Sequence, residues 1–430
     1  MNKVNEFIFE SYNFNVEAKT LELNYSFDGT MHFCEKYHFP FDFVDYSKQA
    51  LDQACQLLFV MAGVSYYKAY APSSVNFRTP ILSSEDIAFF KTVYQMGLGE
   101  FYYKNNLDPN QTINFATEPI VPIQTPARAG EGLLVAIGGG KDSLLSFEIL
   151  KKSHQKIATW SVGHATQLRP LIEKIGVKHY TIERAIDPRL LALNETGVYN
   201  GHIPISALFG SIGTILAILT GYRDVVVSNE NSSNEPTLEY KGMSINHQYS
   251  KSSDFEKAFQ SHLQRHFGET VRYYSFLRPF SELYIADLFA RECFEKYKDV
   301  FSSCNRAFTQ DNNQLFWCGK CPKCSFVFLI LTPFIPKGHL ETLFEGKNLL
   351  EDESLYHMYE KILGINADKP LDCVGEIEES RHAMKIAQDL YPNCGRYSFE
   401  LRPGYNYKKI HSDDMPIEIR SLLTQFLETV

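Results

Sequence analysis

The feature that most constrains this chain is a run of three glycines followed by Lys, Asp and Ser, at residues 138–143. An apolar run, residues 133–137, stands directly before it, and a segment of helical character, residues 143–151, follows. Successive glycines let the backbone turn tightly and approach a ligand, because they carry no Cβ atom. The helix then presents unpaired N–H groups and the positive end of its dipole. The pattern predicts an anion-binding loop between a buried strand and a helix.

The side chains of this loop indicate a phosphate ligand with a metal. Lys141 adds a point charge and Ser143 a hydroxyl donor, whereas Asp142 needs a reason to lie beside an anion, and holding Mg²⁺ supplies one. The loop is not a Walker sequence, because the Lys-Ser order is absent. It resembles the Ser-Gly-Gly-x-Asp-Ser loop of the N-type ATP pyrophosphatases, with Gly138 where Ser is usual. The expected ligands of ATP and Mg²⁺ in this loop are Gly138, Gly139, Gly140, Lys141, Asp142 and Ser143.

From residue 133 onward, segments typical of strands and helices alternate. Such alternation predicts an α/β fold with a doubly wound, mostly parallel sheet. Ligands of these sheets lie at the carboxyl ends of the strands. Gly163 ends the second expected strand, and Asn229 and Glu230 end the fourth, so we expect adenosine contacts there, with Glu230 sharing the metal. An ordinary turn is an equally good interpretation of Asn229 and Glu230. The expected strands after the first are 157–162, 178–182, 224–228 and 272–277, and the expected helices are 167–175 and 204–219.

The length of 430 residues predicts two or three domains. Residues 1–125 are expected to form an N-terminal α+β domain with strands at 7–9 and 21–27 and a helix at 46–61. A linker rich in Pro and Gly is expected at 119–132. The domain with the glycine loop should then cover 130–335, and a mostly helical C-terminal extension 336–430.

Four of the 9 cysteines crowd into residues 304–324, with two consecutive Cys-x-x-Cys spacings. Three thiolates at this spacing surround one point, and a fourth closes a tetrahedron, so a structural Zn²⁺ is expected. An iron–sulfur cluster stays open as the alternative, because four thiolates suit it too. The pattern is similar to the cysteine cluster of the synthases that make 7-cyano-7-deazaguanine. The expected metal ligands are Cys304, Cys318, Cys321 and Cys324.

Charge and hydropathy exclude several classes of partner. The net charge of -9 and the lack of a basic block argue against nucleic acid. The first residues lack the layout of a signal peptide. The longest apolar stretch, 203–219, is shorter than the roughly 20 residues of a membrane span. We therefore expect a cytoplasmic protein without a membrane partner, and its oligomeric state is left open.

Several longer blocks together resemble the family of UDP-N-acetyl-alpha-D-muramoyl-L-alanyl-L-glutamate epimerases. The likeness spans nearly the whole chain, and the long blocks are more specific than the glycine loop alone. The blocks are residues 62–69, 97–101, 138–143, 200–204, 227–230, 246–252, 277–279, 281–283 and 369–376, with the cysteine cluster.

This resemblance implies an isomerase of peptidoglycan synthesis that uses ATP and Mg²⁺. The implied reaction inverts the terminal L-glutamate of UDP-MurNAc-L-Ala-L-Glu through an acyl-adenylate, with release of AMP and pyrophosphate. Adenylation makes chemical sense here, because a proton beside a free carboxylate is very hard to remove. The acyl-adenylate removes that negative charge and turns the carbonyl into an electron sink.

Inversion also needs groups that remove and return a proton. Cys373 is the leading candidate because it lies outside the metal cluster in a polar segment, although a buried structural thiol is an equally good interpretation. His247 and Lys251 are further catalytic candidates, in a polar stretch that suits a binding loop. Lys68, His202 and Arg278 are expected to contact the substrate, although His202 also suits a helix cap before Pro204. Arg278 suits a carboxylate because guanidinium binds it in a bidentate pair, and a surface residue before Pro279 is an equally good interpretation.

Two other enzyme classes fit the same loop. A carboxylate-adenylating synthase of the 7-cyano-7-deazaguanine type shares the loop and the cysteine cluster, but no glutaminase-type nucleophile motif stands out to supply ammonia. A tRNA-modifying enzyme is disfavoured by the acidic charge. A zinc-held binding module without catalysis is disfavoured by the intact Lys141, Asp142 and Ser143.

Overall fold

The computed structural model describes residues 4–80, 82–116, 123–153, 155–308, 313–365 and 368–430. Part of the expected linker, residues 119–122, and the first three residues lie outside this range. Cα packing divides the chain into two compact units. Unit 1 comprises Met1–Leu134, Tyr180–Val225 and Glu239–Tyr274, and unit 2 comprises Val135–His179, Val226–Leu238 and Ser275–Val430. The consecutive domains expected from the sequence, 1–125, 130–335 and 336–430, stay a prediction.

Within the described residues, ten strands form one sheet in the order β12-β9-β6-β7-β8-β3-β2-β1-β4-β5. The first five strands of this order have the sequence order 5-4-1-2-3, which is the arrangement of doubly wound α/β sheets. The remaining five were not expected in the same sheet. They join it because β3 pairs antiparallel with β8, with Tyr37 opposite Arg184. The sheet is therefore mixed. Its strands are β1 Glu6–Asn15, β2 Thr20–Phe27, β3 Met31–His38, β4 Ser74–Phe77, β5 Asn114–Phe115, β6 Leu133–Ala136, β7 Ile157–Val162, β8 His179–Ala185, β9 Asp224–Val227 and β12 Arg272–Ser275.

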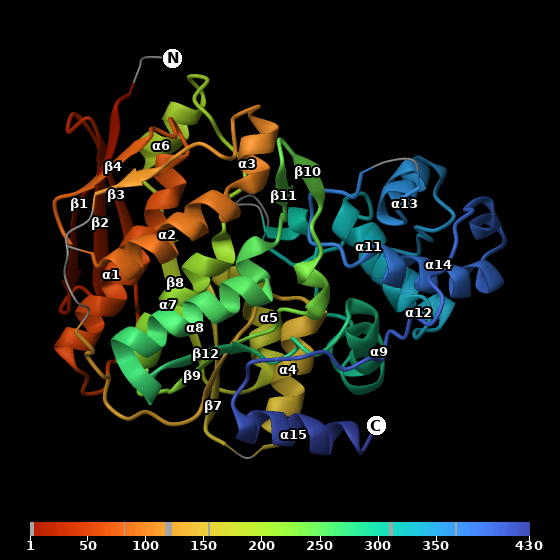
Figure 1. Ribbon diagram of the computed structural model, residues 1–430. Coiled ribbons are helices and arrows are strands. Elements are labelled where there is room, and N and C mark those ends of the chain that lie inside the picture. Colours follow the sequence, from red (N-terminus) through yellow and green to blue (C-terminus); the bar gives the residue numbers. More distant parts are fainter. Residues whose placement is uncertain (1–3, 81, 117–122, 154, 309–312, 366–367) are drawn as a thin grey trace. The chain divides into compact units, whose positions relative to one another are not determined.

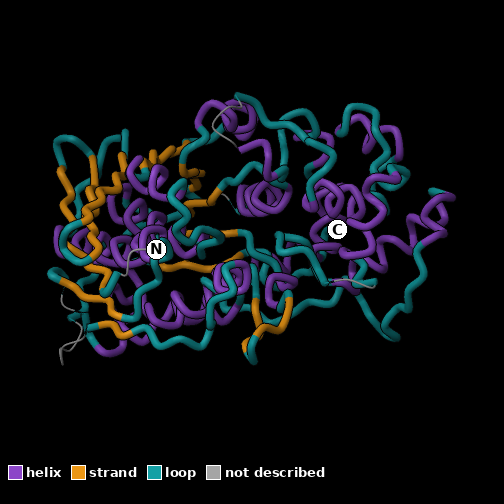
Figure 2. Tube along the Cα trace, turned by 90° about the horizontal axis from the view of Figure 1, so that it is seen from above, coloured by secondary structure: helices purple, strands orange, loops and turns teal. Residues whose placement is uncertain are grey.

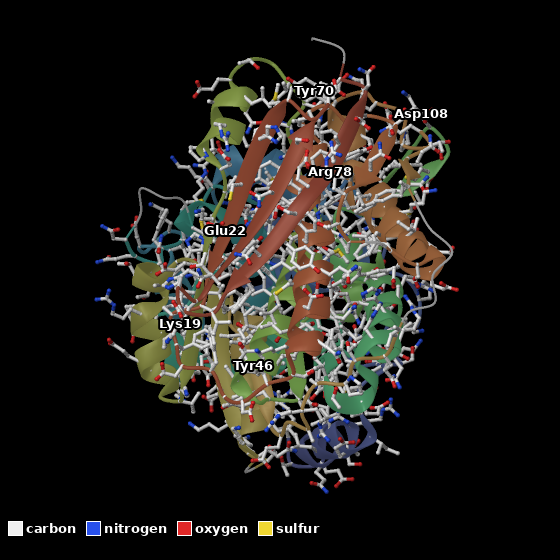
Figure 3. The ribbon with its side chains drawn as sticks, turned by 90° about the vertical axis from the view of Figure 1, so that its left-hand side faces the viewer. Lys19, Glu22, Tyr46, Tyr70, Arg78 and Asp108 are labelled. Atoms are coloured by element: carbon white, nitrogen blue, oxygen red, sulfur yellow. The ribbon has the colours of Figure 1, made fainter. Side chains whose placement is uncertain are left out.

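Unit 1 is built around an aromatic core on the β1–β2 hairpin. The next turn, between β2 and β3 at residues 28–30, has positive φ at both Asp28 and Gly29. Alternate residues of β2 are buried, and the ring of Tyr25 stacks on Phe59 of α1. The opposite face of β1–β3 carries polar side chains, among them the labelled Glu22 (Figure 3). The expected half-buried strand at residues 21–27 is thus confirmed.

Helices cover the buried side of this hairpin. α1 packs on α7, an apolar helix whose interior positions are almost all buried, and α2 packs on α8 (Figure 1). The expected buried helix at 204–219 is confirmed as α7. The helices of unit 1 are α1 Lys48–Tyr67, α2 Ser84–Gly97, α3 Gly99–Lys104, α6 Pro188–Asn194, α7 Ile205–Thr220 and α8 Ser253–Phe267, and a small two-stranded sheet joins β10 Leu238–Tyr240 to β11 Met243–Ile245.

Unit 2 contains the glycine loop, the cysteine cluster and the C-terminal part of the chain. After β12 the described residues form helices and loops without a further strand, as the purple and teal tube around the C-terminus shows (Figure 2). α4 packs on α9, and α11 packs on both α9 and α14. The helices of unit 2 are α4 Lys141–Lys151, α5 Ala165–Ile175, α9 Glu282–Glu292, α10 Phe294–Tyr297, α11 Pro322–Leu331, α12 Lys337–Leu343, α13 Tyr356–Ile362, α14 Ile377–Leu390 and α15 Ile417–Leu427.

Among the helices that the structure describes, none has the length and apolar character that a membrane crossing requires.

Candidate active site

The glycine loop leaves β6 and enters α4, as the sequence predicts. Gly139 has φ +90°, a conformation that L side chains rarely adopt. A Cβ atom on Gly140 would lie 2.6 Å from the side-chain hydroxyl of Ser303, so the position accommodates glycine alone unless that side chain moves. At Gly138 an added Cβ meets nothing within 4 Å. The Ser that is usual in this position of the pyrophosphatase loop would therefore fit here without steric cost.

The side chains of the loop join a buried charge cluster. Lys141 is 1% exposed, and its Nζ donates hydrogen bonds to Asp142 and to Glu282 at the first turn of α9. Lys323 of α11 lies 3.6 Å from the second oxygen of Glu282. Two ammonium groups thus share two carboxylates. We call these four residues, Lys141, Asp142, Glu282 and Lys323, the loop cluster.

The charges of the loop cluster hold its lysines protonated. Burial by itself would lower the pKa of Lys141, but the negative charges of Asp142 and Glu282 outweigh it and raise the pKa. The same balance raises the pKa of Lys323, where the charges of Glu282 and Asp142 act against burial. Both lysines are therefore cations at neutral pH, which is the state that a phosphate ligand requires.

The turn after β9 lies in the same unit and contributes to the cluster. Glu230 is 5% exposed, and its charge is among those that raise the pKa of Lys323. Its carbonyl oxygen accepts a hydrogen bond from Nη1 of Arg278, at 2.6 Å. Arg278 is itself 1% exposed and also donates to the hydroxyl of Ser233. It therefore supports the turn that carries Glu230, and its expected contact with a substrate carboxylate stays a prediction.

Two other sequence candidates end strands of unit 2. The side chain of Asn229 is buried, and its carbonyl oxygen accepts a hydrogen bond of 2.6 Å from the hydroxyl of Ser275 on β12. Gly163 follows β7 with φ +65°, and an added Cβ would meet nothing within 4 Å. Both residues follow strands next to β6 in the sheet order, where a doubly wound sheet binds its ligand.

The four cysteines expected to bind metal come together. Their Sγ atoms all lie within 4.8 Å of one another, and Cys318 Sγ lies 3.8 Å from Cys324 Sγ. The backbone N–H groups of Lys320 and Cys324 donate to the sulfurs of Cys318 and Cys321, each at 3.4 Å. Four sulfurs at this separation fit the tetrahedral shell of one metal ion. The prediction of a four-cysteine cluster is confirmed.

This cysteine cluster is joined directly to the glycine loop. The backbone N–H of Ser302 donates to the carbonyl oxygen of Gly139, at 3.0 Å, two residues before Cys304. Lys323, which belongs to the loop cluster through its contact with Glu282, stands between Cys321 and Cys324. A metal at the four cysteines would therefore hold two supports of the anion loop in place.

Cys373 lies near the loop cluster in unit 2. Its thiol is half-buried, and its electrostatic interaction with Lys323 is among those that raise the pKa of that lysine. The backbone N–H of Cys373 donates to Asp372 Oδ1 at 2.7 Å, and Asp372 accepts two further hydrogen bonds from the amide of Asn305. The segment is thus held in place by polar contacts, although the catalytic role of the thiol stays a prediction.

The remaining candidates lie in unit 1, around Glu100 of α3. His247 donates from Nδ1 to Glu100 Oε2, and His202 Nδ1 lies 3.8 Å from the same oxygen. The centroids of the two imidazole rings are 4.4 Å apart. Lys68 donates to Asn200 Oδ1 at 2.6 Å and to the carbonyl oxygen of Gly201 at 2.8 Å. We call Glu100, His202 and His247 the imidazole cluster.

The environment of this cluster shifts the pKa values of Glu100, His202 and Lys68. Burial would raise the pKa of Glu100, but the hydrogen bond and charge of His247 lower it. Burial, together with the charges of His247, Lys251 and Lys68, lowers the pKa of His202 to about 4. Burial lowers the pKa of Lys68 to about 8. Glu100 is therefore ionised and His202 neutral at pH 7.

Several residues of these two clusters were missed by the sequence analysis. Glu282 and Lys323 stand in segments that the family resemblance marks, but neither has a neighbour in sequence that indicates a partner in the loop. Glu100 follows Gly99 in another marked block. A carboxylate directly after an N-cap Ser, as in Glu282, is also the ordinary pattern of a helix start, so only its contact with Lys141 reveals its place.

An anion loop at the reversal point of a doubly wound sheet, together with a four-cysteine metal cluster, defines an α/β protein of the nucleotide-handling type. Comparison with known families narrows this class. The family model described as the MurL N-terminal domain matches residues 1–276, and the MurL C-terminal domain matches residues 300–393. The chain belongs to the MurL family of UDP-N-acetyl-alpha-D-muramoyl-L-alanyl-L-glutamate epimerases.

Three relatives carry this epimerase name. The protein of Xanthomonas oryzae pv. oryzae (strain MAFF 311018) is 41% identical over 354 residues, which cover 81% of this chain and 77% of the relative. The protein of Micromonospora sp. (strain ATCC 39149 / NRRL 15099 / SCC 1413) is 36% identical, covering 90% of this chain and 87% of the relative. That of Salinispora tropica (strain ATCC BAA-916 / DSM 44818 / JCM 13857 / NBRC 105044 / CNB-440) is 36% identical, covering 90% and 85%.

Proposed function

We propose that this chain epimerises the terminal L-glutamate of UDP-MurNAc-L-Ala-L-Glu to D-glutamate, in an ATP-dependent reaction of peptidoglycan precursor synthesis. Membership of the epimerase family over most of the chain is the observation that carries the proposal. The glycine loop and the lysines of the loop cluster support the use of ATP.

We propose that the loop of unit 2 carries out the first half-reaction. A carboxylate oxygen of the substrate attacks the α-phosphorus of ATP, the bond to the pyrophosphate oxygen breaks, and an acyl-adenylate forms. Gly138, Gly139 and Gly140 offer backbone N–H groups to the departing pyrophosphate, and Ser143 offers its hydroxyl. Lys141 and Lys323 neutralise the charge that develops on it.

Mg²⁺ fits the carboxylates of this site, because it prefers oxygen ligands and substrate phosphates. Asp142, whose side chain is 23% exposed, and the buried Glu230 are the residues proposed to hold it. The ion would supply charge neutralisation on the pyrophosphate. Gly163 and Asn229 are proposed to contact the adenosine.

Zn²⁺ is the proposed metal of the four cysteines, in a structural role, because four protein ligands leave no position for a substrate. Its effect on the reaction would be indirect, because it would hold in place the segment of Ser302, whose backbone N–H donates to the carbonyl oxygen of Gly139.

The second half-reaction needs proton transfer at Cα. The candidates are Cys373, His247 and Lys251, and the proposed substrate contacts are those of Lys68, His202 and Arg278. Adenylation lowers the barrier because the electron pair released from the C–H bond moves into the carbonyl of the acyl group. Water then releases AMP and the epimerised carboxylate.

The test is incubation of the protein with UDP-MurNAc-L-Ala-L-Glu, ATP and Mg²⁺, followed by acid hydrolysis and chiral separation of glutamate. We expect D-glutamate together with AMP and pyrophosphate, and none of these without ATP. If only L-glutamate is recovered although AMP is formed, the epimerase function is wrong and adenylation stands. If ADP is formed in place of AMP, the role of the loop is wrong.

A further inference from the structure

Two glycines of unit 1, Gly97 and Gly99, make room for the segments that form the imidazole cluster. A Cβ atom on Gly97 would lie 2.7 Å from Cβ of Pro204, and one on Gly99 would lie 3.1 Å from Cδ1 of Ile245. Neither glycine has the positive φ that would require glycine for conformational reasons. Their lack of a side chain therefore allows two loops to pack against the start of α3, where Glu100 lies.

These two loops carry the histidines. His202 stands two residues before Pro204, and His247 stands two residues after Ile245. Packing of the loops on the two glycines thus brings both imidazoles to Glu100, although the three residues are about 100 and 45 positions apart in the sequence. Three separate segments therefore meet at this point because two glycines leave room for them, and a positioned functional group requires support of this kind.

The hydrogen bond to Glu100 determines which ring nitrogen of His247 carries the proton. An ionised carboxylate can only accept hydrogen bonds, so the imidazole donates from Nδ1. In the neutral ring the lone pair then lies on Nε2, which is the tautomer of a general base. When Nε2 takes a proton, the carboxylate of Glu100 stabilises the imidazolium. The side chains of Glu100 and His247 are 13% and 12% exposed, so the pair is shielded without being sealed in the core.

A proton donor lies close to this base. The charge of Lys251 acts on His202, and the 3-10 helix Tyr249–Lys251 begins two residues after His247. Lys251 donates to Gln248 Oε1 at 3.4 Å. Carboxylate, imidazole and ammonium therefore stand together on short, polar segments of one unit. Glu100, His202 and His247 also offer three ligand atoms within 4.8 Å of one another, so a bound metal ion is an outcome that the experiment has to distinguish.

We propose that His247, oriented by Glu100, and Lys251 form the two-sided proton-transfer centre of the reaction. The inference rests on the proposed function and assigns the step that it leaves open. His247 Nε2 takes the α-proton as the C–H electron pair moves onto the carbonyl oxygen of the acyl-adenylate. The ammonium of Lys251 returns a proton to the other face of Cα while that electron pair moves back. His247 is then protonated and Lys251 neutral, and exchange with water restores both. Glu100 is a positioning residue.

The experiment measures two reactions of the full chain separately. Exchange of pyrophosphate into ATP, in the presence of the dipeptide substrate, reports adenylation. Uptake of deuterium from D₂O at Cα reports proton transfer. We expect His247→Gln and Lys251→Gln to keep pyrophosphate exchange within about threefold of wild type and to lose epimerisation by at least about a hundredfold, as is usual for loss of a general acid or base.

Deuterium uptake then distinguishes the two faces. A two-sided centre that lacks one group can still exchange the proton on the other face. We expect each variant to incorporate deuterium into only one epimer, L or D, and the two variants to differ in which one. Glu100→Gln should slow exchange from the face of His247 without changing the KM of the substrate, a selectivity that a purely structural role would not give. The exposed His32→Gln is the matched control and should match wild type.

Three results would overturn the inference. Normal deuterium uptake into both epimers by His247→Gln is one. Loss of uptake in Cys373→Ala with retention in His247→Gln is the second, because it assigns the proton to the thiol. The third is a second metal ion, besides that of the cysteines, whose loss from the Glu100 and His247 variants accounts for their inactivity. Absence of pyrophosphate exchange in the wild type would instead overturn the proposed function, and the inference with it.

Discussion

The loop cluster of unit 2 and the imidazole cluster of unit 1 are both built from carboxylates and bases, yet they differ in kind. In the loop cluster the bases are lysines, buried and held cationic by their partners. In the imidazole cluster they are half-buried histidines, and His202 is neutral at pH 7. Permanent charges suit the binding of phosphates, and groups that change charge suit proton transfer. The difference separates activation of the substrate from inversion of its Cα.

Unit 1 contains a second carboxylate–imidazole group, and its surroundings differ from those of the imidazole cluster. Asp86 accepts a hydrogen bond of 2.9 Å from His266 and lies 3.3 Å from His262, and all three are buried. The guanidinium of Arg265 lies 3.6 Å from the same oxygen of Asp86. This group joins α2 to α8 inside the unit, and its charges are compensated within the core. Partial exposure and lysine neighbours distinguish the cluster of Glu100 from it.

The largest expected difference between the units concerns metal removal. Structural Zn²⁺ sites contribute roughly 10 kcal/mol or more to folding. A chelator should therefore unfold unit 2 around residues 313–331 and leave the β1–β2 region of unit 1 folded. Metal analysis should find about one Zn²⁺ per chain, and hydrogen exchange followed by mass spectrometry should show which segments lose protection. Equal loss of protection in both units, or a chain without metal, would contradict this contrast.

Next in size is the loss of adenylation in Asp142→Ala. Removal of the proposed metal ligand should lower ATP–pyrophosphate exchange and AMP formation by about a thousandfold, the scale of a lost electrostatic contact to a leaving group. The exposed Asp299→Ala of the same unit should be unaffected. An active Asp142→Ala variant would show that the loop does not bind the phosphates in this way.

Stability should distinguish the clusters when each loses one carboxylate charge. Glu282→Gln leaves two buried ammonium groups with one carboxylate fewer, and removal of one partner of a buried ion pair costs about 3–5 kcal/mol. Glu100→Gln, in a half-buried setting, should cost only about 1 kcal/mol. Urea unfolding of both variants measures the two differences. Equal losses would show that burial does not separate the clusters.

The last contrast is an opposite dependence of the two units on pH. The pKa of His262 is lowered by burial from 6.5 to about 4, so the unfolded chain binds its proton first and unit 1 loses stability as pH falls from about 6.5 to about 4. The pKa of Glu379 in α14 is raised by burial and by Glu376 from 4.5 to about 8. The folded state therefore holds that proton longer, and this contribution is complete below about pH 4.5 and is lost as pH rises through about 8.

The contributions of His262 and Glu379 to the pH dependence of stability can be tested separately. Each group contributes at most about 1.4 kcal/mol per pH unit. His262→Gln should flatten the acid side of the stability profile, and Glu379→Gln, which resembles the protonated carboxyl, should flatten the rise in unfolding towards pH 8. Thermal melts at intervals of half a pH unit, from pH 4 to 8, measure both. A His262 variant that changes only the alkaline side would contradict the assignment.

Local patterns predicted most of the elements in the neighbourhood of the glycine loop. β6, α4, β7, α5 and α7 lie within a few residues of their expected bounds, because short apolar runs and helical periodicity are properties of the local sequence. Sheet membership was not predictable in this way. The pairing of Tyr37 with Arg184 joins residues far apart in the chain, and nothing in either segment indicates its partner.

The sequence by itself therefore determined the local features: the glycine loop between strand and helix, the spacing of the cysteines and the family of the chain. Only the tertiary structure decided that Glu282 and Lys323 complete the charges around Lys141, and that Glu100, His202 and His247 meet. The physical reason is that an anion loop needs consecutive backbone groups, which one segment supplies. A buried charge or a positioned base needs partners, and these can come from any segment that the fold brings close.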